Sequence, residues 1–172
     1  MKHETKEISF KASDITDTGS FSGYASTWEG PPDAYNDIIA PGAFTKTLKE
    51  HNRFPLLWSH DTHSPIGVIY GREDTTGLAV TGQIALDVQK GREVHALMKM
   101  KAITGLSIGY EAIQAVTDRK TGARRLTEIR LVEISPVVLP ACDTARIAEV
   151  KAAEDARKAR VEVFRLIDKF RL

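Results

Sequence analysis

Residues 104–139, TGLSIGYEAIQAVTDRKTGARRLTEIRLVEISPVVL, contain two long segments rich in β-forming residues, separated by a turn. The segments span residues 104–116 and 124–139, and both favour strands because Ile, Val, Thr and Tyr fit a pleated surface. Between them, Asp118 to Gly122 has the composition of a hairpin turn. The stretch therefore predicts a long antiparallel hairpin and makes β-sheet the main structure of the chain.

The residues before this hairpin predict more short strands and only two helices. Residues 5–13 and 20–28 are expected to pair as a hairpin through the turn formers of residues 14–19. Further strands are expected at 36–40, 54–60, 65–71 and 77–87, and helices at 41–50 and 90–101. Many short strands with few helices favour a β-barrel or a sandwich.

The composition changes after about Thr144. Residues 145–172 are rich in Ala, Lys, Arg and Glu, contain no Gly or Pro, and carry an apolar stripe at helical spacing. We therefore expect a β domain over residues 1–146 and a long C-terminal helix over residues 147–172. The stripe is expected to pack on the β domain or on a second subunit.

Composition excludes several classes of function. Of the 172 residues, 42% are hydrophobic and 27% charged, so an apolar core needs no support from disulfides or metals. The 24 basic and 23 acidic residues nearly cancel, which gives no electrostatic case for nucleic acid or an anionic membrane. The polar start of the chain is not a signal peptide, no apolar run is long enough to span a membrane, and the single cysteine, Cys142, fits a reducing cytoplasm.

His60 has the most informative context of the five histidines. It ends the apolar segment FPLLWSH, and strand alternation places it on one face with Phe54, Leu56 and Trp58. An imidazole in such a row needs a partner for at least one ring nitrogen. His60 is therefore a candidate general base, with a core histidine satisfied by the backbone as the alternative.

Ser107 is the candidate nucleophile. Leu106 and Ile108 share one face of its strand, and Gly105, Ser107 and Gly109 share the other, which leaves space where a substrate backbone could approach. The alternative is a strand serine beside bulge glycines. The residues around Ser107 do fit the pattern GxSxG. A nucleophile elbow, however, requires a strand followed by a turn and a helix, and here the motif is followed by more strand.

Glu133 is the candidate third residue, because a carboxylate in an apolar row needs a partner and an imidazole N–H would satisfy it. The alternative is a glutamate at the surface or one paired with Arg130 or Arg125. His63 or Asp61 could orient His60 instead. The expected face of Glu133 also carries Ile129, Leu131 and Val137.

Cys142 is a weaker candidate for a nucleophile paired with His60, since a small buried or loop side chain is the common role of a lone cysteine. No metal and no cofactor is predicted. The chain has neither a CxxC nor an HExxH zinc pattern, and it lacks a GxxxxGK(S/T) phosphate loop.

Several short motifs follow one another in order between residues 20 and 148. They are GYAS at Gly23–Ser26, DIIAPGAF at Asp37–Phe44, LWSHD at Leu57–Asp61, PIG at Pro65–Gly67, LSIGY at Leu106–Tyr110, and VEISPV at Val132–Val137 leading to Pro140 and Ala141. This ordered set resembles the prohead protease family of tailed phages. No single motif is specific, and the resemblance rests on their order.

The resemblance implies a serine protease related in fold to the herpesvirus assemblins, a closed antiparallel β-barrel with flanking helices. It maps the general base to His60 and the nucleophile to Ser107, whereas assemblins use a second histidine where the last strand here offers Glu133. By analogy, the loop after that strand would supply the oxyanion donors, with Asp143 and Thr144 as candidates.

The resemblance also implies the partners and the place of action. Family members act in the host cytoplasm, inside the immature procapsid, where they cleave the scaffolding protein, the scaffolding segment of the major capsid protein, and usually themselves. A homodimer or higher self-association is expected, because assemblins are active as dimers. A non-catalytic scaffolding protein with the same barrel, and a small β-barrel binding module, are the competing interpretations.

Overall fold

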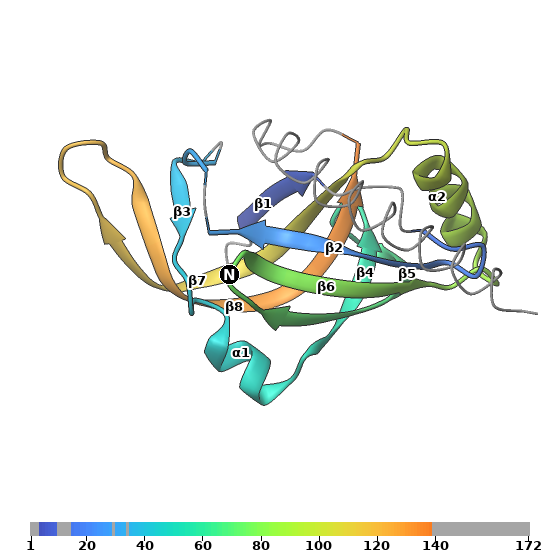
Figure 1. Cartoon of the computed structure of the whole chain (residues 1–172), viewed down its shortest axis with the longest axis horizontal. Coiled ribbons are helices and arrows are strands. Elements are labelled where there is room, and N and C mark those ends of the chain that lie inside the picture. The colour runs from blue at the N-terminus through green and yellow to red at the C-terminus, as the bar shows by residue number, and fades with distance from the viewer. Residues whose placement is uncertain (1–3, 10–14, 29, 34, 139–172) are drawn as a thin grey trace, which may run out of the picture.

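The structure is a computed structural model that describes residues 4–9, 15–28, 30–33 and 35–138 (Figure 1). Its strands are β1 (Glu4–Ser9), β2 (Ser20–Thr27), β3 (Asp37–Ile39), β4 (Arg53–Trp58), β5 (Asp61–Glu73), β6 (Gly77–Ile84), β7 (Gly105–Thr117) and β8 (Arg124–Val137). Its helices are α1 (Thr45–Glu50) and α2 (Gln89–Lys99). The predicted helix over residues 147–172 and the predicted domain boundary at residue 146 lie outside the described residues.

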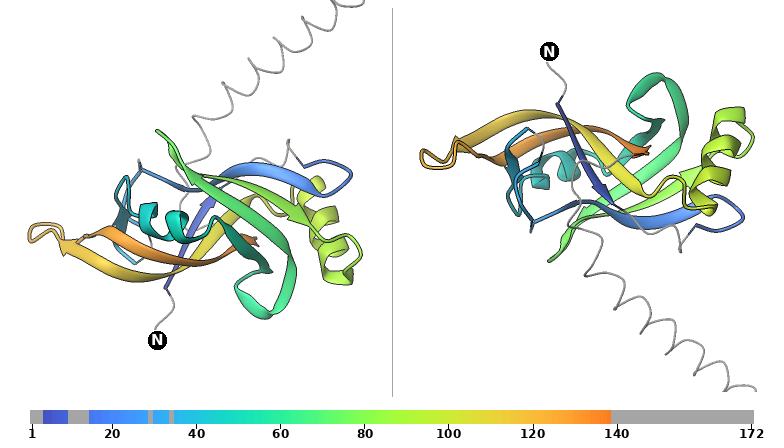
Figure 2. Two further views of the ribbon diagram at one scale, coloured as in Figure 1. Left: turned by 90° about the horizontal axis from the view of Figure 1, so that it is seen from below. Right: turned by 90° about the horizontal axis from the view of Figure 1, so that it is seen from above.

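The strands form one curled sheet in the order β1-β7-β8-β4-β5-β6-β2, and β3 pairs in parallel with the outer end of β8 (Figure 2). The prediction of a closed antiparallel barrel is wrong. Closure would require backbone hydrogen bonds between the end strands, and among the described strands no ladder joins β1 to β2. The sheet is an open half-barrel, and its middle contains one parallel contact, where Leu56 of β4 pairs with Ile134 of β8.

The predicted hairpin between residues 5–13 and 20–28 is also wrong. β1 pairs with β7, in a register that runs from Glu4 opposite Tyr110 to Ser9 opposite Gly105. β2 pairs with β6 instead. The residue pattern identified both segments as strands, but the pairing of strands is decided by the whole sheet and not by their neighbours in sequence.

The predicted hairpin of β7 and β8 is confirmed. The two strands pair from Gly105 opposite Val137 to Thr117 opposite Arg124, with three irregularities of register. In the turn, the Asp118 carboxylate accepts hydrogen bonds from the N–H groups of Lys120 and Thr121. The hairpin crosses the sheet, and its outer half extends beyond the body of the molecule as an arm (Figure 1).

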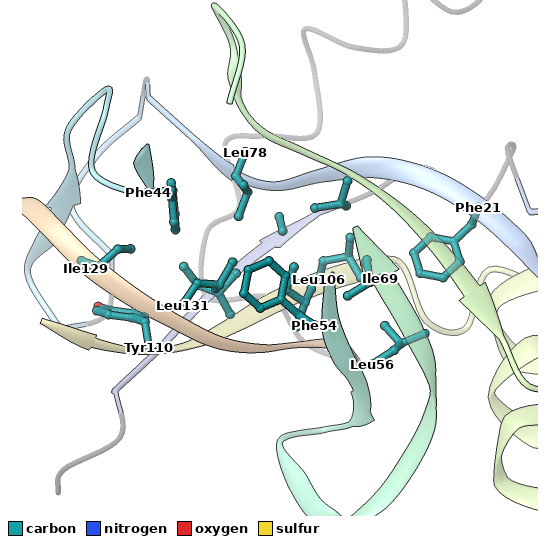
Figure 3. Close-up of a cluster of buried hydrophobic side chains, with 14 of the residues drawn as sticks. Phe21, Phe44, Phe54, Leu56, Ile69, Leu78, Leu106, Tyr110, Ile129 and Leu131 are labelled. Atoms are coloured by element: carbon teal, nitrogen blue, oxygen red, sulfur yellow. The ribbon is translucent and has the colours of Figure 1, made fainter. Parts of the chain in front are cut away.

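The concave side of the sheet encloses the hydrophobic core (Figure 3). Alternating residues of the strands supply it, and full burial of each large apolar side chain stabilises the fold by about 1.5–3 kcal/mol. Val94 and Met98 of α2 add to the core from one end. The buried members with the largest side chains include Phe44, Phe54, Leu56, Ile69, Leu106 and Tyr110.

Candidate active site

His60 lies in the turn between β4 and β5, not in the strand predicted over residues 54–60. The strand ends at Trp58, and both Ser59 and His60 have left-handed backbones, with φ of 50° and 63°. This turn breaks the alternation that would have placed His60 on the face of Phe54 and Leu56. The face predicted for His60 is therefore wrong.

Ser107 lies in the inner half of β7, between β1 and β8. Leu106, Ile108 and Tyr110 point into the core, as the alternation predicted. Ser107 therefore lies on the opposite, convex face of the sheet, where Ser135 is its partner in β8.

Glu133 reaches the same convex face because β8 contains a bulge. Gly109 pairs with Glu133 but Tyr110 pairs with Leu131, so Val132 is an extra residue in β8. The bulge reverses the alternation, with Leu131 in the core and Glu133 on the side of Ser107. The prediction that Glu133 shares a face with Ile129 and Leu131 is wrong for this reason.

The structure brings the three predicted residues together in a chain of hydrogen bonds. His60 Nδ1 lies 2.5 Å from Glu133 Oε1, and His60 Nε2 lies 2.7 Å from Ser107 Oγ. An ionised carboxylate only accepts hydrogen bonds, so Nδ1 carries the imidazole proton and Nε2 is free to accept the proton of Ser107. This is the order of contacts that a serine nucleophile and its general base require.

The site is sheltered but open at the imidazole. Ser107 is fully buried and the Glu133 side chain is 8% exposed, whereas the His60 side chain is 22% exposed. The carboxylate is therefore held in a largely water-free environment, in which its hydrogen bonds are strong. The exposed edge of the imidazole indicates that the site is accessible from solvent at this point.

Comparison with known proteins identifies the family. The sequence model described as caudovirus prohead serine protease matches residues 6–159. The chain belongs to this family. The fold is similar to the solved structure of the bacteriophage T4 capsid assembly protease, gp21, with a TM-score of 0.64 and 13% sequence identity, over 81% of this chain and 98% of that chain. No curated protein matches.

In this prohead protease family member, Gly109 has a different role from the one that its spacing suggested. A Cβ atom at Gly109 would lie 2.3 Å from Glu133 Oε1 and 3.0 Å from Glu133 Cδ. The space over this glycine is therefore occupied by the carboxylate, and not left open for a substrate backbone. The glycine allows the side chain of Glu133 to lie flat across β7 toward His60.

Asp61, one of the two alternative partners of His60, is engaged elsewhere. The Asp61 carboxylate accepts hydrogen bonds from Ser64 Oγ at 2.6 Å and from the His63 N–H at 2.9 Å. These bonds, the one from Ser64 first, lower the pKa of Asp61. Arg130, the proposed charge partner of Glu133, lies 3.1 Å from Glu111 instead. Asp61 thus shapes the turn that carries His60 and leaves Nδ1 to Glu133.

Three predicted residues lie outside the part of the chain that the structure describes. They are Cys142, the weaker candidate nucleophile, and Asp143 and Thr144, the candidate oxyanion donors. One residue that sequence reasoning missed is Ser135, which contacts both Glu133 and His60. Ser135 could have been identified because it pairs with Ser107 across the hairpin. That pairing becomes known only once the register of β7 and β8 is known.

Among the described residues, no group of three or more His, Cys, Asp or Glu side chains could hold a metal ion. No helix in the described ranges has the length and hydropathy needed to cross a membrane. The side chains of Ser107 and His60 meet on the same side of the sheet. Side chains on opposite sides of the sheet would have favoured the non-catalytic assembly protein.

Proposed function

We propose that this chain is a serine endopeptidase of capsid maturation, with Ser107 as nucleophile, His60 as general base and Glu133 as the residue that orients His60. The observation that carries the proposal is the continuous contact from Ser107 Oγ through the imidazole to Glu133 Oε1. Membership of the caudovirus prohead serine protease family supports the same chemistry.

The reaction follows from the order of these contacts. Ser107 Oγ attacks the carbonyl carbon of the scissile peptide bond while its proton passes to His60 Nε2. The C–N bond then breaks, the leaving amine takes that proton, and an acyl-enzyme remains on Ser107. Water, deprotonated by His60, releases the acid product. Glu133 stabilises the imidazolium in both steps because its Oε1 accepts a hydrogen bond from the Nδ1–H group.

The substrates are the scaffolding protein or the scaffolding segment of the major capsid protein, together with the enzyme itself, within the immature procapsid. The family description and the name of the T4 neighbour, a capsid assembly protease, support this proposal. The segment after β8, with Asp143 and Thr144, is the proposed source of oxyanion donors. Self-association of the enzyme is proposed as well.

The test uses a fluorophosphonate, which needs no knowledge of the cleavage sequence. Attack by Ser107 Oγ forms an O–P bond, breaks the P–F bond and releases fluoride, and intact-mass spectrometry follows the adduct. The wild type is expected to be labelled at Ser107, whereas Ser107→Ala and His60→Ala are not. Glu133→Gln is expected to slow labelling at least ~100-fold while the fold is kept, since loss of an orienting carboxylate costs up to ~10⁴ in turnover.

Ser26→Ala is the matched control for these variants. Ser26 is another fully buried serine, in β2, and its Oγ has no hydrogen-bond partner in the described part of the chain. Its removal is expected to leave the labelling rate unchanged. Labelling of Ser107→Ala at the wild-type rate, or a wild type with no adduct at Ser107, would contradict the proposed function.

A further inference from the structure

We infer that Ser135 is a positioning residue of this site, which fixes the carboxylate of Glu133 and the backbone of His60 with one hydroxyl group. The inference deepens the proposed function and rests on it. Ser135 is fully buried in β8 and contacts both the proposed general base, His60, and the carboxylate that orients it, Glu133. No substrate atom is required to contact it, so it acts through its neighbours.

The first contact fixes the carboxylate. Ser135 Oγ lies 2.6 Å from Glu133 Oε2 and donates its proton there, while Oε1 accepts from His60 Nδ1. Both carboxylate oxygens thus accept a hydrogen bond, one from Ser135 of the same strand and one from His60 of the β4–β5 turn. Without the Ser135 hydroxyl, the buried oxygen Oε2 would lose this hydrogen-bond donor. The carboxylate could then rotate more easily about its Cγ–Cδ bond.

The second contact fixes the turn of His60. The N–H of His60 donates to Ser135 Oγ at 3.0 Å, and the N–H of Ser59 donates to the carbonyl oxygen of Pro136 at 3.3 Å. These two N–H groups belong to the two consecutive left-handed residues of the turn. A non-glycine residue adopts that conformation only where its surroundings impose it. Successive residues of β8 therefore impose the backbone that aims the imidazole.

The donor and acceptor roles of the hydroxyl are complementary. A serine hydroxyl has one proton to donate and lone pairs to accept with, and the two contacts use the donor on Glu133 and an acceptor on His60. Each of these two bonds polarises the hydroxyl in the direction that strengthens the other. A side chain that lacks the hydroxyl would weaken the orientation of the base and of its carboxylate together.

The experiment measures the rate of fluorophosphonate labelling at Ser107 as a function of reagent concentration, which separates reagent binding from the chemical step. Ser135→Ala is expected to slow the maximal labelling rate roughly 10–100-fold, with the half-saturating concentration within about twofold of wild type. Ser135→Thr, which keeps the Oγ atom, is expected to label within about fivefold of wild type. Circular dichroism and thermal unfolding verify the fold, and Ser26→Ala is the buried-serine control.

A double-mutant cycle separates positioning from a merely structural role. If Ser135 acts in part through Glu133, Ser135→Ala slows labelling by a clearly smaller factor in the Glu133→Gln background than in wild type, because only the contact with the His60 N–H is then left to lose. Equal losses in both backgrounds overturn the inference, as does a wild-type rate in folded Ser135→Ala. If the alanine variant does not fold, folded Ser135→Thr decides, and a loss above about tenfold overturns the inference. An unlabelled wild type would instead refute the proposed function itself.

Discussion

Gly109 shows how one missing side chain builds the site. Its backbone lies against the carboxylate of Glu133, in a place where any Cβ atom would overlap Oε1. The neighbour that would have to move is the far end of a side chain and not the backbone of a strand. A substitution at Gly109 is therefore expected to displace the carboxylate and leave the sheet in place.

We predict that Gly109→Ala folds but labels at Ser107 at least ~10-fold more slowly than wild type, because the displaced carboxylate no longer orients His60. Fluorophosphonate labelling and thermal unfolding check this in the same preparation. Gly82→Ala is a contrasting variant, since its Cβ would overlap the ring of Phe21, at 2.3 Å. It is expected to reduce stability, with no selective effect on the site. A Gly109→Ala enzyme with the wild-type rate would contradict this account.

At the scale of elements, alternation predicted the strands well and failed where the backbone departs from a regular strand. Ser107 was placed correctly because β7 is regular from Gly105 to Gly109. The faces of His60 and Glu133 were wrong because a left-handed turn and a bulge interrupt the period of two. These interruptions carry no clear residue signature, since neither Ser59, His60 nor Val132 is a glycine. The three side chains nevertheless lie in contact, although two of the faces predicted for them were wrong, and their catalytic roles stay a prediction.

Turns at the ends of strands are held by carboxylates, and Asp74 illustrates this in the β5–β6 turn. Its Oδ1 accepts from the N–H groups of Thr76 and Gly77, and its Oδ2 accepts from the Tyr24 hydroxyl. Burial alone would raise the pKa of Asp74, but these three hydrogen bonds together lower it below its ordinary value. The ionised form is thus favoured in the folded protein.

This lowered pKa sets the sign of a pH dependence. Asp74 stabilises the fold fully above its unfolded pKa of about 3.9, and the contribution is lost as the pH falls through the lower folded pKa. Asp74→Asn is therefore expected to be less stable than wild type at pH 6, with a difference that shrinks as the pH is lowered below about 4. Urea unfolding at several pH values measures this. A difference that grows on acidification would contradict it.

The whole molecule is an open curl, and the site lies where four neighbouring strands meet. The order β7-β8-β4-β5 places the strand of Ser107, the strand of Glu133 and the turn that carries His60 side by side. The sequence could not predict that the sheet stays open, because closure depends on whether two distant end strands, β1 and β2, share a ladder. The sequence could not predict the parallel contact between β4 and β8 in the middle of the sheet either. That contact consists of a single pair of residues, Leu56 and Ile134, which is too short to leave a pattern in the sequence.

An ion pair with a buried carboxylate and a partly exposed guanidinium links the strands at the outer end of the sheet. Asp37 of β3 is fully buried, and Arg124 at the start of β8 donates to it through Nε at 2.7 Å and Nη2 at 2.6 Å. The Tyr110 hydroxyl donates to the same carboxylate at 3.3 Å. The pair therefore joins β3, β7 and β8 through charge and hydrogen bonding at one point.

We predict that Asp37→Ala lowers the free energy of unfolding by about 1.5–3 kcal/mol, because it removes the buried carboxylate that accepts charge-assisted hydrogen bonds from Arg124. Urea unfolding measures the loss. Arg130→Ala is the matched control, since it breaks the exposed pair with Glu111 and is expected to cost less than about 1 kcal/mol. Equal losses of unfolding free energy in the two variants would show that the pair of Asp37 and Arg124 stabilises the fold no more than the exposed pair does.

The bulge at Val132 also divides the β7–β8 hairpin into two parts with different freedom to vary. The inner part, from Gly105 to Gly109 and from Glu133 to Val137, keeps Ser107 and Glu133 in register because β1 pairs with it on one side and β4 on the other. The outer part already contains two further irregularities of register, between Ala112 and Ala115, and ends in the free turn at Asp118. Because β3 pairs with Arg124 to Leu126, the segment that is free to change in length is the turn of residues 118–123, where insertions or deletions can be absorbed before they reach the inner part. The fold thus provides a place where chain length can diverge while the chemistry stays constant.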